Sequence, residues 1–284
     1  MSTPAVREFV NNRSEFEERL VAVGGQRIRV SIRRGDGGVP LVLCNGIGAS
    51  LEVLEPLVHE LDPATTVIRF DVPGVGASPQ SFAPYGFPYL AWVLGRALTE
   101  LGFGVVDVLG LSWGGALAQQ FAFQNPWRCR RLVLVATGTG ALMVPGHPRV
   151  LAKMMTPRRF SDPHYAAAIA GDLYGGSVRD NGEDVARLFG KQEYPGSRIG
   201  YVHQLMAGSI WTSLFALPVI RQRTLIIAGT DDPIIPVVNA HIMNRLLPRS
   251  TLHLHDGGHV DLVTNSTALA PVIDEFRRSR GRRP

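Results

Sequence analysis

The stretch VLGLSWGGALA, residues 108–118, decides the fold of this chain. The residues from Val105 to Leu111 are mostly apolar, as in a buried strand, and the small and apolar residues after Gly114 continue at helical spacing. Ser112 stands between them with Gly110 and Gly114 on either side, which predicts a sharp strand-to-helix turn with the serine at its tip. The alternative is a plain turn in which Ser112 only caps the helix.

Further apolar runs alternate with helical patterns along the 284 residues, which are enough for one large domain. The runs lie at 40–44, 66–70, 131–136, 223–228 and 251–255. Continuous apolar strands that alternate with helices indicate an α/β fold, in which helices cover both faces of a mostly parallel sheet. A hairpin turn at Gly24-Gly25-Gln26 marks the start of this domain.

One interval between two predicted strands is too long for a simple crossover. Residues 141–213 fill it, with helical patterns near 150–155, 165–173 and 202–217 and with four of the six methionines of the chain. We therefore expect an inserted helical cap. The predicted division is a polar leader at 1–20, an α/β core at 21–140 and 214–284, and the cap at 141–213.

A serine hydroxyl becomes a good nucleophile only when a base and an orienting acid accompany it. His259 stands in a glycine-rich loop directly after the predicted strand at 251–255, and Asp232 follows the predicted strand at 223–228. The order Ser112, Asp232, His259 is the order of nucleophile, acid and base in α/β-hydrolases, which other serine hydrolases do not share. These three residues are the predicted catalytic residues.

The acid has a second candidate, Asp231, next to Asp232. We favour Asp232 because it stands three residues after Gly229 and directly before Pro233, which biases it towards an extended backbone at the end of the strand. Helix capping or a solvated turn is the alternative for both carboxylates.

Ester hydrolysis also needs N–H groups that receive the oxyanion. One normally comes from the residue after the nucleophile and one from a loop after an earlier strand, which here predicts Trp113 and Ile47. Ile47 lies in Asn45-Gly46-Ile47-Gly48, where the glycines let the main chain face a carbonyl oxygen. A plain strand-to-helix turn is the alternative for this loop.

A group of histidines and a carboxylate near the end of the chain raises the possibility of a metal site. It consists of His253, His255, Asp256 and His259. His253 and His255 fall on one face of a predicted strand whose other face carries leucines, which is ordinary alternation. We therefore expect no metal and no cofactor.

The formal net charge of +5 equals the charge of five arginines at the C-terminal end. They are Arg277, Arg278, Arg280, Arg282 and Arg283. We expect a solvated basic end, and the lack of a basic stripe with interleaved aromatic residues speaks against nucleic acid as a partner.

The two cysteines and the N-terminal residues predict the cellular location of the protein. Cys44 and Cys129 lie within or directly before apolar runs, as reduced thiols of a cytoplasmic protein do. Residues 1–20 contain no apolar stretch long enough for a signal peptide, and no run approaches the roughly 20 apolar residues of a membrane span. We expect a cytoplasmic protein without a transmembrane segment.

Several stretches resemble the intracellular medium-chain-length polyhydroxyalkanoate depolymerases of the α/β-hydrolase superfamily. In the predicted core they are NGIGA (45–49), FDVPGVG (70–76), SWGGALAQQFA (112–122) and DP (232–233), and in the predicted cap MVPG (143–146), PRR (157–159), YGG (174–176) and WTS (211–213). The resemblance covers roughly residues 25–275. The sequence departs from the family pattern at Asp261, a carboxylate shortly after His259 where an apolar side chain is expected. It implies the α/β-hydrolase fold, with Ser112 as nucleophile, Asp232 as acid and His259 as base.

The resemblance also implies a substrate. The chain would hydrolyse the ester links of stored poly(3-hydroxyalkanoate) through an acyl-enzyme and release 3-hydroxy fatty acids, working at the surface of storage granules. Large apolar side chains and adaptable methionines of the cap would form the wall for the apolar substrate chain, with packing inside the cap as their alternative role. They are Leu142, Met143, Met154, Met155, Trp211 and Phe215.

Other functions stay open at this point. A general carboxylesterase or lipase would use the same three residues, and a carbon–carbon hydrolase for ring-cleavage products also uses a serine on this fold. A non-catalytic protein that coats granules or binds a ligand is the alternative outside enzymes.

Overall fold

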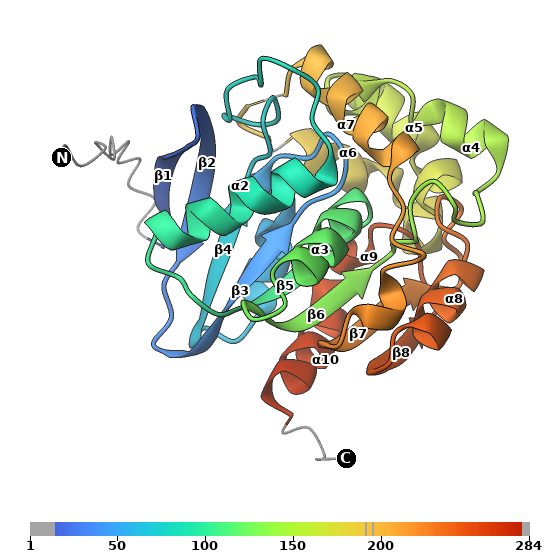
Figure 1. Cartoon of the computed structure of the whole chain (residues 1–284). Coiled ribbons are helices and arrows are strands. Elements are labelled where there is room, and N and C mark those ends of the chain that lie inside the picture. The colour runs from blue at the N-terminus through green and yellow to red at the C-terminus, as the bar shows by residue number, and fades with distance from the viewer. Residues whose placement is uncertain (1–14, 191, 195, 280–284) are drawn as a thin grey trace.

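An eight-stranded sheet runs through the part of the chain that the computed structural model describes, residues 15–190, 192–194 and 196–279 (Figure 1). Its strand order is β1-β2-β4-β3-β5-β6-β7-β8. β2 runs antiparallel to both of its neighbours, and all pairs from β4 to β8 are parallel. The strands are β1 (Glu17–Val23), β2 (Gln26–Arg33), β3 (Gly37–Cys44), β4 (Thr65–Phe70), β5 (Val106–Leu111), β6 (Cys129–Val135), β7 (Arg223–Gly229) and β8 (Ser250–His255). The predicted mostly parallel sheet is confirmed.

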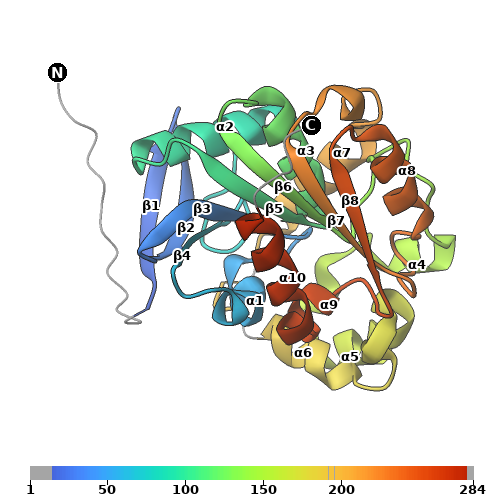
Figure 2. The same cartoon turned by 90° about the horizontal axis from the view of Figure 1, so that it is seen from below.

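Helices cover both faces of this sheet, because the central strands are apolar on both sides. The helices α2 (Phe87–Glu100), α3 (Trp113–Gln124) and α8 (Val238–Leu246) pack against one face. The helices α1 (Glu55–Glu60) and α10 (Ser266–Arg278) pack against the other, as Figure 2 shows from below. The two apolar layers that result fix the sheet as a rigid support for the loops at its edge.

The interval between β6 and β7 forms a group of helices to one side of the sheet (Figure 1). In its described part they are α4 (Pro148–Lys153), α5 (Pro163–Tyr174), α6 (Gly182–Gly190) and α7 (Arg198–Ile210). Three of them lie where the sequence pattern predicted helices, although α7 ends at Ile210 and not near residue 217. The helix α6 was not predicted; Val185, Leu188 and Phe189 bury its inner face.

The first strand begins at Glu17, so the sheet starts inside the segment predicted as a polar leader. Residues 1–14 of that segment lie outside the described residues. Within the residues that are described, none of the helices has the length and apolar character needed to cross a lipid bilayer. Both cysteines are buried and free.

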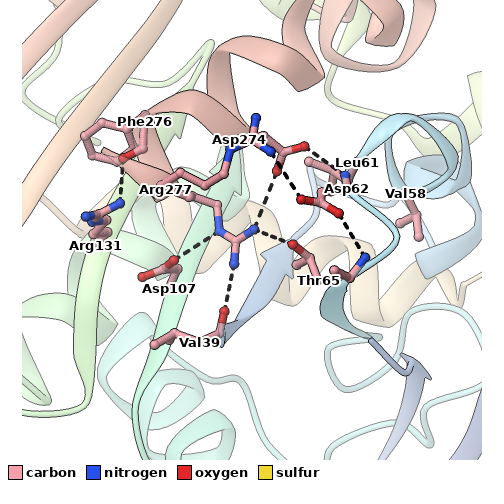
Figure 3. A network of polar contacts seen from close by, with 12 residues as sticks. Val39, Val58, Leu61, Asp62, Thr65, Asp107, Arg131, Asp274, Phe276 and Arg277 are labelled. Atoms are coloured by element: carbon pink, nitrogen blue, oxygen red, sulfur yellow. Dashed lines mark hydrogen bonds and ion pairs between the residues drawn. The ribbon is translucent and has the colours of Figure 1, made fainter. Parts of the chain in front are cut away.

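Arg277 corrects the prediction of a solvated basic end. Its side chain is buried, and Nε donates to Asp107 Oδ2 at 3.0 Å. Its Nη1 donates to Thr65 Oγ1 at 2.9 Å and its Nη2 to the carbonyl oxygen of Val39 at 2.7 Å (Figure 3). The guanidinium therefore joins α10 to the starts of β3, β4 and β5, and it is a structural charge.

The neighbouring Arg278 lies on an exposed side of α10 and donates to Asp62 Oδ2 at 3.2 Å. Consecutive helical residues point about 100° apart, so one of two adjacent arginines can face the sheet while the other faces water. Arg280, Arg282 and Arg283 lie outside the described residues.

Candidate active site

Ser112 stands at the tip of a strained turn between β5 and α3. Its backbone angles are φ 53° and ψ −118°, a left-handed conformation that side-chain-bearing residues rarely adopt. A Cβ on Gly110 would lie 2.3 Å from the carbonyl oxygen of Gly114, and one on Gly114 would lie 2.1 Å from that of Cys44. Both glycines are therefore required for the helix to pass this closely over the strands.

The structure brings Ser112, His259 and Asp232 together. The Nε2 atom of His259 lies 2.8 Å from Ser112 Oγ, and its Nδ1 atom lies 2.8 Å from Asp232 Oδ2. His259 and Asp232 are both buried, and the second oxygen of Asp232 accepts the N–H groups of Ile234 and Ile235, each at 2.9 Å. A carboxylate held in this way can orient the imidazole so that Nε2 accepts the hydroxyl proton.

The rival carboxylate, Asp231, faces the cap. It accepts two hydrogen bonds of 2.7 Å from Arg179 and one of 2.8 Å from the N–H of Gly176. The hydrogen bonds from Arg179 hold the pKa of the Asp231 carboxyl below its ordinary value. Its partners lie in the segment that follows α5, so Asp231 joins the core to the cap.

A residue of the cap also holds His259. The main-chain N–H of His259 donates to the carbonyl oxygen of Tyr174 at 2.7 Å, and the two rings stack with their centroids 6.4 Å apart. A Cβ on Gly258 would lie 2.2 Å from that same carbonyl oxygen, so the histidine loop and the end of α5 are in close contact. The orientation of the imidazole therefore depends on the cap as well as on Asp232.

The two predicted oxyanion donors flank Ser112. Trp113 is the first residue of α3, whose N–H has no acceptor inside the helix, and Ile47 lies in the loop after β3. Among the described residues, neither N–H is bonded to a protein acceptor. Gln204 of α7 contacts both donor segments. Its Oε1 accepts the N–H of Gly48, next to Ile47, at 2.8 Å, and its carbonyl oxygen accepts the Nε1–H of Trp113 at 2.9 Å.

Two cavities meet at Ser112. The first, which we call the histidine-side cavity, has a volume of about 40 Å³ and is lined by Asn45, Ile47, Ser112, Arg159, Tyr174, His259 and further, mostly apolar residues. The second, the tryptophan-side cavity, has a volume of about 280 Å³ and is lined by Ser112, Ile47, Trp113, Met143, Trp211 and further mostly apolar residues. A substrate carbonyl beside Ser112 therefore has a small compartment on one side and a larger apolar one on the other.

The predicted substrate wall is only partly found at these cavities. Met143 and Trp211 line the tryptophan-side cavity, and Met154 lines the histidine-side cavity. Leu142, Met155 and Phe215 line neither, because they point outward, with 54%, 63% and 79% of their surface exposed. Met155 contributes to a separate hollow between Pro145 and Leu151.

The sequence analysis did not identify two polar residues of the histidine-side cavity, Arg159 and Tyr174. Both belong to the cap, and both were noted only as parts of stretches that resemble the depolymerases. No pattern within the chain could have placed them beside Ser112, because their position depends on how the cap packs over the sheet.

The histidines near the end of the chain are separated in space. His259 faces Ser112, whereas Nε2 of His255 lies 3.4 Å from Oδ2 of Asp261. The carboxylate that departs from the family pattern is thus buried next to a histidine. The described residues contain no group of three or more His, Cys, Asp or Glu side chains that could hold a metal ion.

Comparisons with known proteins agree with this architecture. The family model of the alpha/beta hydrolase fold matches residues 39–266. The chain is 46% identical over 266 residues to a poly(3-hydroxyalkanoate) depolymerase of Ectopseudomonas oleovorans, with 93% of this chain and 94% of that protein covered. It is 28% identical over 276 residues to a 2-hydroxy-6-oxo-2,4-heptadienoate hydrolase of Pseudomonas putida, with 91% and 95% covered.

Among solved structures, the fold is similar to that of the enol-lactonase from Burkholderia xenovorans LB400. The TM-score is 0.77 at 22% identity, with 92% of this chain and all of that chain covered. At this identity the comparison shows a shared fold, whereas the matches to the family model and to the depolymerase show similarity in sequence. The chain therefore belongs to the α/β hydrolase family, within which the poly(3-hydroxyalkanoate) depolymerases are among its relatives.

Proposed function

We propose that this chain is a serine esterase that hydrolyses the ester bonds of poly(3-hydroxyalkanoate) and releases 3-hydroxy fatty acids. The observation that carries this proposal is the continuous contact from Asp232 through His259 to Ser112 at the junction of two cavities. The choice of polyester as substrate is supported by the 46% identity to a poly(3-hydroxyalkanoate) depolymerase over nearly the whole chain.

Each residue has one task in the reaction. His259 Nε2 accepts the proton of Ser112 as Oγ attacks the ester carbonyl, and Asp232 stabilises the imidazolium that forms. The N–H groups of Trp113 and Ile47 receive the negative charge on the carbonyl oxygen. His259 then gives its proton to the departing alcohol oxygen, and a water molecule, activated by His259 in turn, releases the acyl group from Ser112.

The tryptophan-side cavity is suited to the acyl part of the substrate. Met143 and Trp211 give it an apolar wall, and its volume of about 280 Å³ exceeds that of the histidine-side cavity several times. Burying one methylene group gains about 0.8 kcal/mol, so a five-carbon pendant chain would bind more strongly than a methyl group by roughly 3 kcal/mol. The cavity therefore favours medium-length side chains over a methyl side chain.

The place of action that we propose is the cytoplasm, at the surface of polymer granules. Four residues on the outer face of α7 support it, Ile199, Val202, Met206 and Ile210, which are apolar, follow helical spacing and are 47% to 81% exposed. A contiguous exposed apolar surface of this kind is typical of a contact with another apolar body. On the same helix, Gln204 and Gly208 contact the site, so a polymer surface resting on α7 would lie close to Ser112.

The test compares purified polymer granules with short soluble esters. The proposal predicts hydrolysis of both, with 3-hydroxy fatty acids as the granule product, and loss of both activities in Ser112→Ala. Turnover of soluble esters without any polymer hydrolysis would instead favour a general carboxylesterase. Hydrolysis that is unchanged in Ser112→Ala would remove the serine mechanism altogether.

The granule contact has its own test. Replacing Val202 and Ile210 by serine should weaken binding to granules and slow polymer hydrolysis, while the rate on a soluble ester stays within about twofold, since exposed substitutions disturb the fold little. Equal losses on both substrates would contradict a role of this face in granule contact.

A further inference from the structure

Arg159 is a buried charge beside the nucleophile. It lies in the cap, only 3% of its surface is exposed, and it lines the histidine-side cavity together with Ser112. Its Nη1 atom donates to the carbonyl oxygen of Thr156 at 3.2 Å and to the hydroxyl of Tyr201 at 2.9 Å. Among the described residues, its Nη2 atom reaches only the carbonyl oxygen of Ile47, at 3.4 Å.

The guanidinium of Arg159 is incompletely partnered. Among the described residues, no carboxylate lies within 4.0 Å of it, and its Nε atom has no hydrogen-bond partner. Other buried arginines have more acceptors: Arg29 lies 2.6 Å from Glu52, and the Nη atoms of Arg33 donate to four main-chain carbonyl oxygens, although its Nε atom, like that of Arg159, has no partner among the described residues. The guanidinium lies over the rings of Phe160 and Tyr201, 4.4 Å and 5.5 Å from their centroids, but no anion of the described protein balances its charge.

Such a group indicates an anionic ligand. Removing a guanidinium from water is costly unless an anion or several hydrogen-bond acceptors replace the water. The edge formed by Nε and Nη2, the weakly used edge here, is one that a carboxylate can occupy with two parallel hydrogen bonds. The hydroxyl of Tyr174 lines the same cavity beside Arg159, and it finds no acceptor among the described residues, so it can donate to a carboxylate oxygen.

The chemistry of the reaction says which part of the substrate enters this cavity. His259 gives its proton to the departing alcohol oxygen, and His259 lines the histidine-side cavity. The departing group is therefore on this side of Ser112. In a 3-hydroxyalkanoate polyester that group begins at the oxygen of the next hydroxyacyl unit, whose own carboxyl group is two carbons beyond the carbon that bears the oxygen.

The size of the cavity favours the last unit of a chain. A volume of about 40 Å³ holds about three water molecules, roughly the space of the carboxymethyl arm of the departing unit, whose pendant chain branches off earlier, at the carbon that bears the oxygen. In a unit from the middle of the polymer, the carboxyl group at this position is an uncharged ester, and the cavity would also have to hold the chain that follows it. A terminal unit ends here in a carboxylate.

We propose that Arg159 binds the free carboxylate of the terminal hydroxyacyl unit, so that the enzyme removes units from the carboxyl end of the polyester and also cleaves short oligomers that carry a free carboxylate. This inference rests on the proposed function. Each cleavage breaks the bond between the acyl carbon and the alcohol oxygen, adds one water molecule, and releases a 3-hydroxy acid whose carboxylate was held by Arg159. The acyl part stays on Ser112 until water removes it.

The first experiment uses a soluble hydroxyacyl dimer in two forms, with a free carboxylate and as its methyl ester. Wild-type enzyme should prefer the free acid in kcat/KM by about 10- to 100-fold, the effect of one hydrogen-bonded charge pair. In Arg159→Gln this preference should fall to within about threefold of unity. Arg158→Gln is the matched control, since Arg158 is exposed, pairs with Asp162, and should keep the wild-type preference.

The second experiment needs no variant, which matters if Arg159→Gln does not fold. Polymer with free carboxyl ends is compared with the same polymer after methyl esterification of its ends. Removal of terminal units should release 3-hydroxy acid while the molar mass of the remaining chains changes little, and esterified ends should slow the release.

The outcomes separate the two proposals. Equal rates on free and esterified ends, or a rapid fall in molar mass from internal cleavage, would overturn the role of Arg159 and leave the esterase intact. Failure to hydrolyse polymer and both dimers would overturn the proposed function itself, and with it this inference.

Discussion

The side-chain oxygen of Gln204 accepts the main-chain N–H of Gly48, 2.8 Å away. Gln204 lies on α7 of the cap and is 1% exposed, whereas Gly48 follows Ile47 in the loop after β3. The cap therefore holds the loop that carries one of the two proposed oxyanion donors. Tyr174 holds the histidine loop in a similar way, so the geometry around Ser112 depends on the cap at two points.

Gln204→Leu should lower kcat much more than it raises KM. The substitution leaves the buried N–H of Gly48 without an acceptor and frees the loop at Ile47, and loss of one oxyanion donor reduces kcat by about 100-fold or more. We expect a decrease of about 10-fold or more on a soluble ester, because the donor is displaced and not removed. The exposed Gln124→Leu is the control, and a rise in KM at constant kcat would assign Gln204 to substrate binding instead.

The two adjacent aspartates should behave differently when each is changed to asparagine. Asp232→Asn disturbs the hydrogen bond that orients His259, so kcat should fall by about 10⁴-fold, as for other triads of this kind. Asp231→Asn keeps His259 in place and weakens an exposed ion pair with Arg179, so kcat should stay within about twofold of wild type. Steady-state kinetics on one ester decides, and comparable losses in both variants would contradict the assignment of Asp232.

The parallel sheet and the contact of Ser112, Asp232 and His259 could both be predicted from the sequence, because both depend on local sequence patterns. Each of the three residues follows an apolar run, and strands that run parallel bring their carboxyl ends to one edge. The geometry at Ser112 follows from the glycines beside it, which nothing larger could replace.

The positions that the sequence did not predict correctly depend on contacts between distant segments. Arg277 stands in a run of arginines and reads as a solvated end, yet it is buried on Asp107 and Thr65. Phe215 and Met155 have the composition of a pocket wall but point outward. Arg159 enters the site only because the cap turns back over the sheet.

The stability of the protein should contain a contribution that depends on the ionisation of Asp71. Its carboxylate is buried and accepts the N–H groups of Leu51 and Ala77, and burial raises its pKa to about 7, against the opposing effect of Arg29. Because this pKa is higher in the folded chain than in the unfolded one, the contribution is present below about pH 4 and is lost as the pH rises through 7.

The measurement for Asp71 is urea unfolding of wild type and Asp71→Asn at several pH values between 4 and 8. Asparagine does not titrate, so the unfolding free energy of wild type should fall relative to the variant over this interval, by at most about 1.4 kcal/mol per pH unit. Parallel curves for the two proteins would mean that Asp71 titrates alike in both states.

Arg277 should contribute more to stability than its neighbour Arg278. In Arg277→Met the fully buried Asp107 keeps only Arg130 as a charged partner among the described residues, and removing one member of a buried ionic network typically costs about 3 to 5 kcal/mol. Arg278→Met removes an exposed pair with Asp62 and should cost about 0.5 kcal/mol or less. Denaturant unfolding of the two variants and of wild type at pH 7 measures both losses.

The activity of the Arg277 variant distinguishes this role from one in the site. Asp107 is near the start of β5 and Ser112 directly follows its end, so this residue of the network in Figure 3 is about 16 Å from the nucleophile along the strand. Arg277→Met should therefore keep kcat at temperatures where it remains folded. In the double variant with Asp107→Asn the loss should be smaller than the sum of the two single losses, because the unpaired buried charge is then gone; strict additivity would mean that the two side chains act independently.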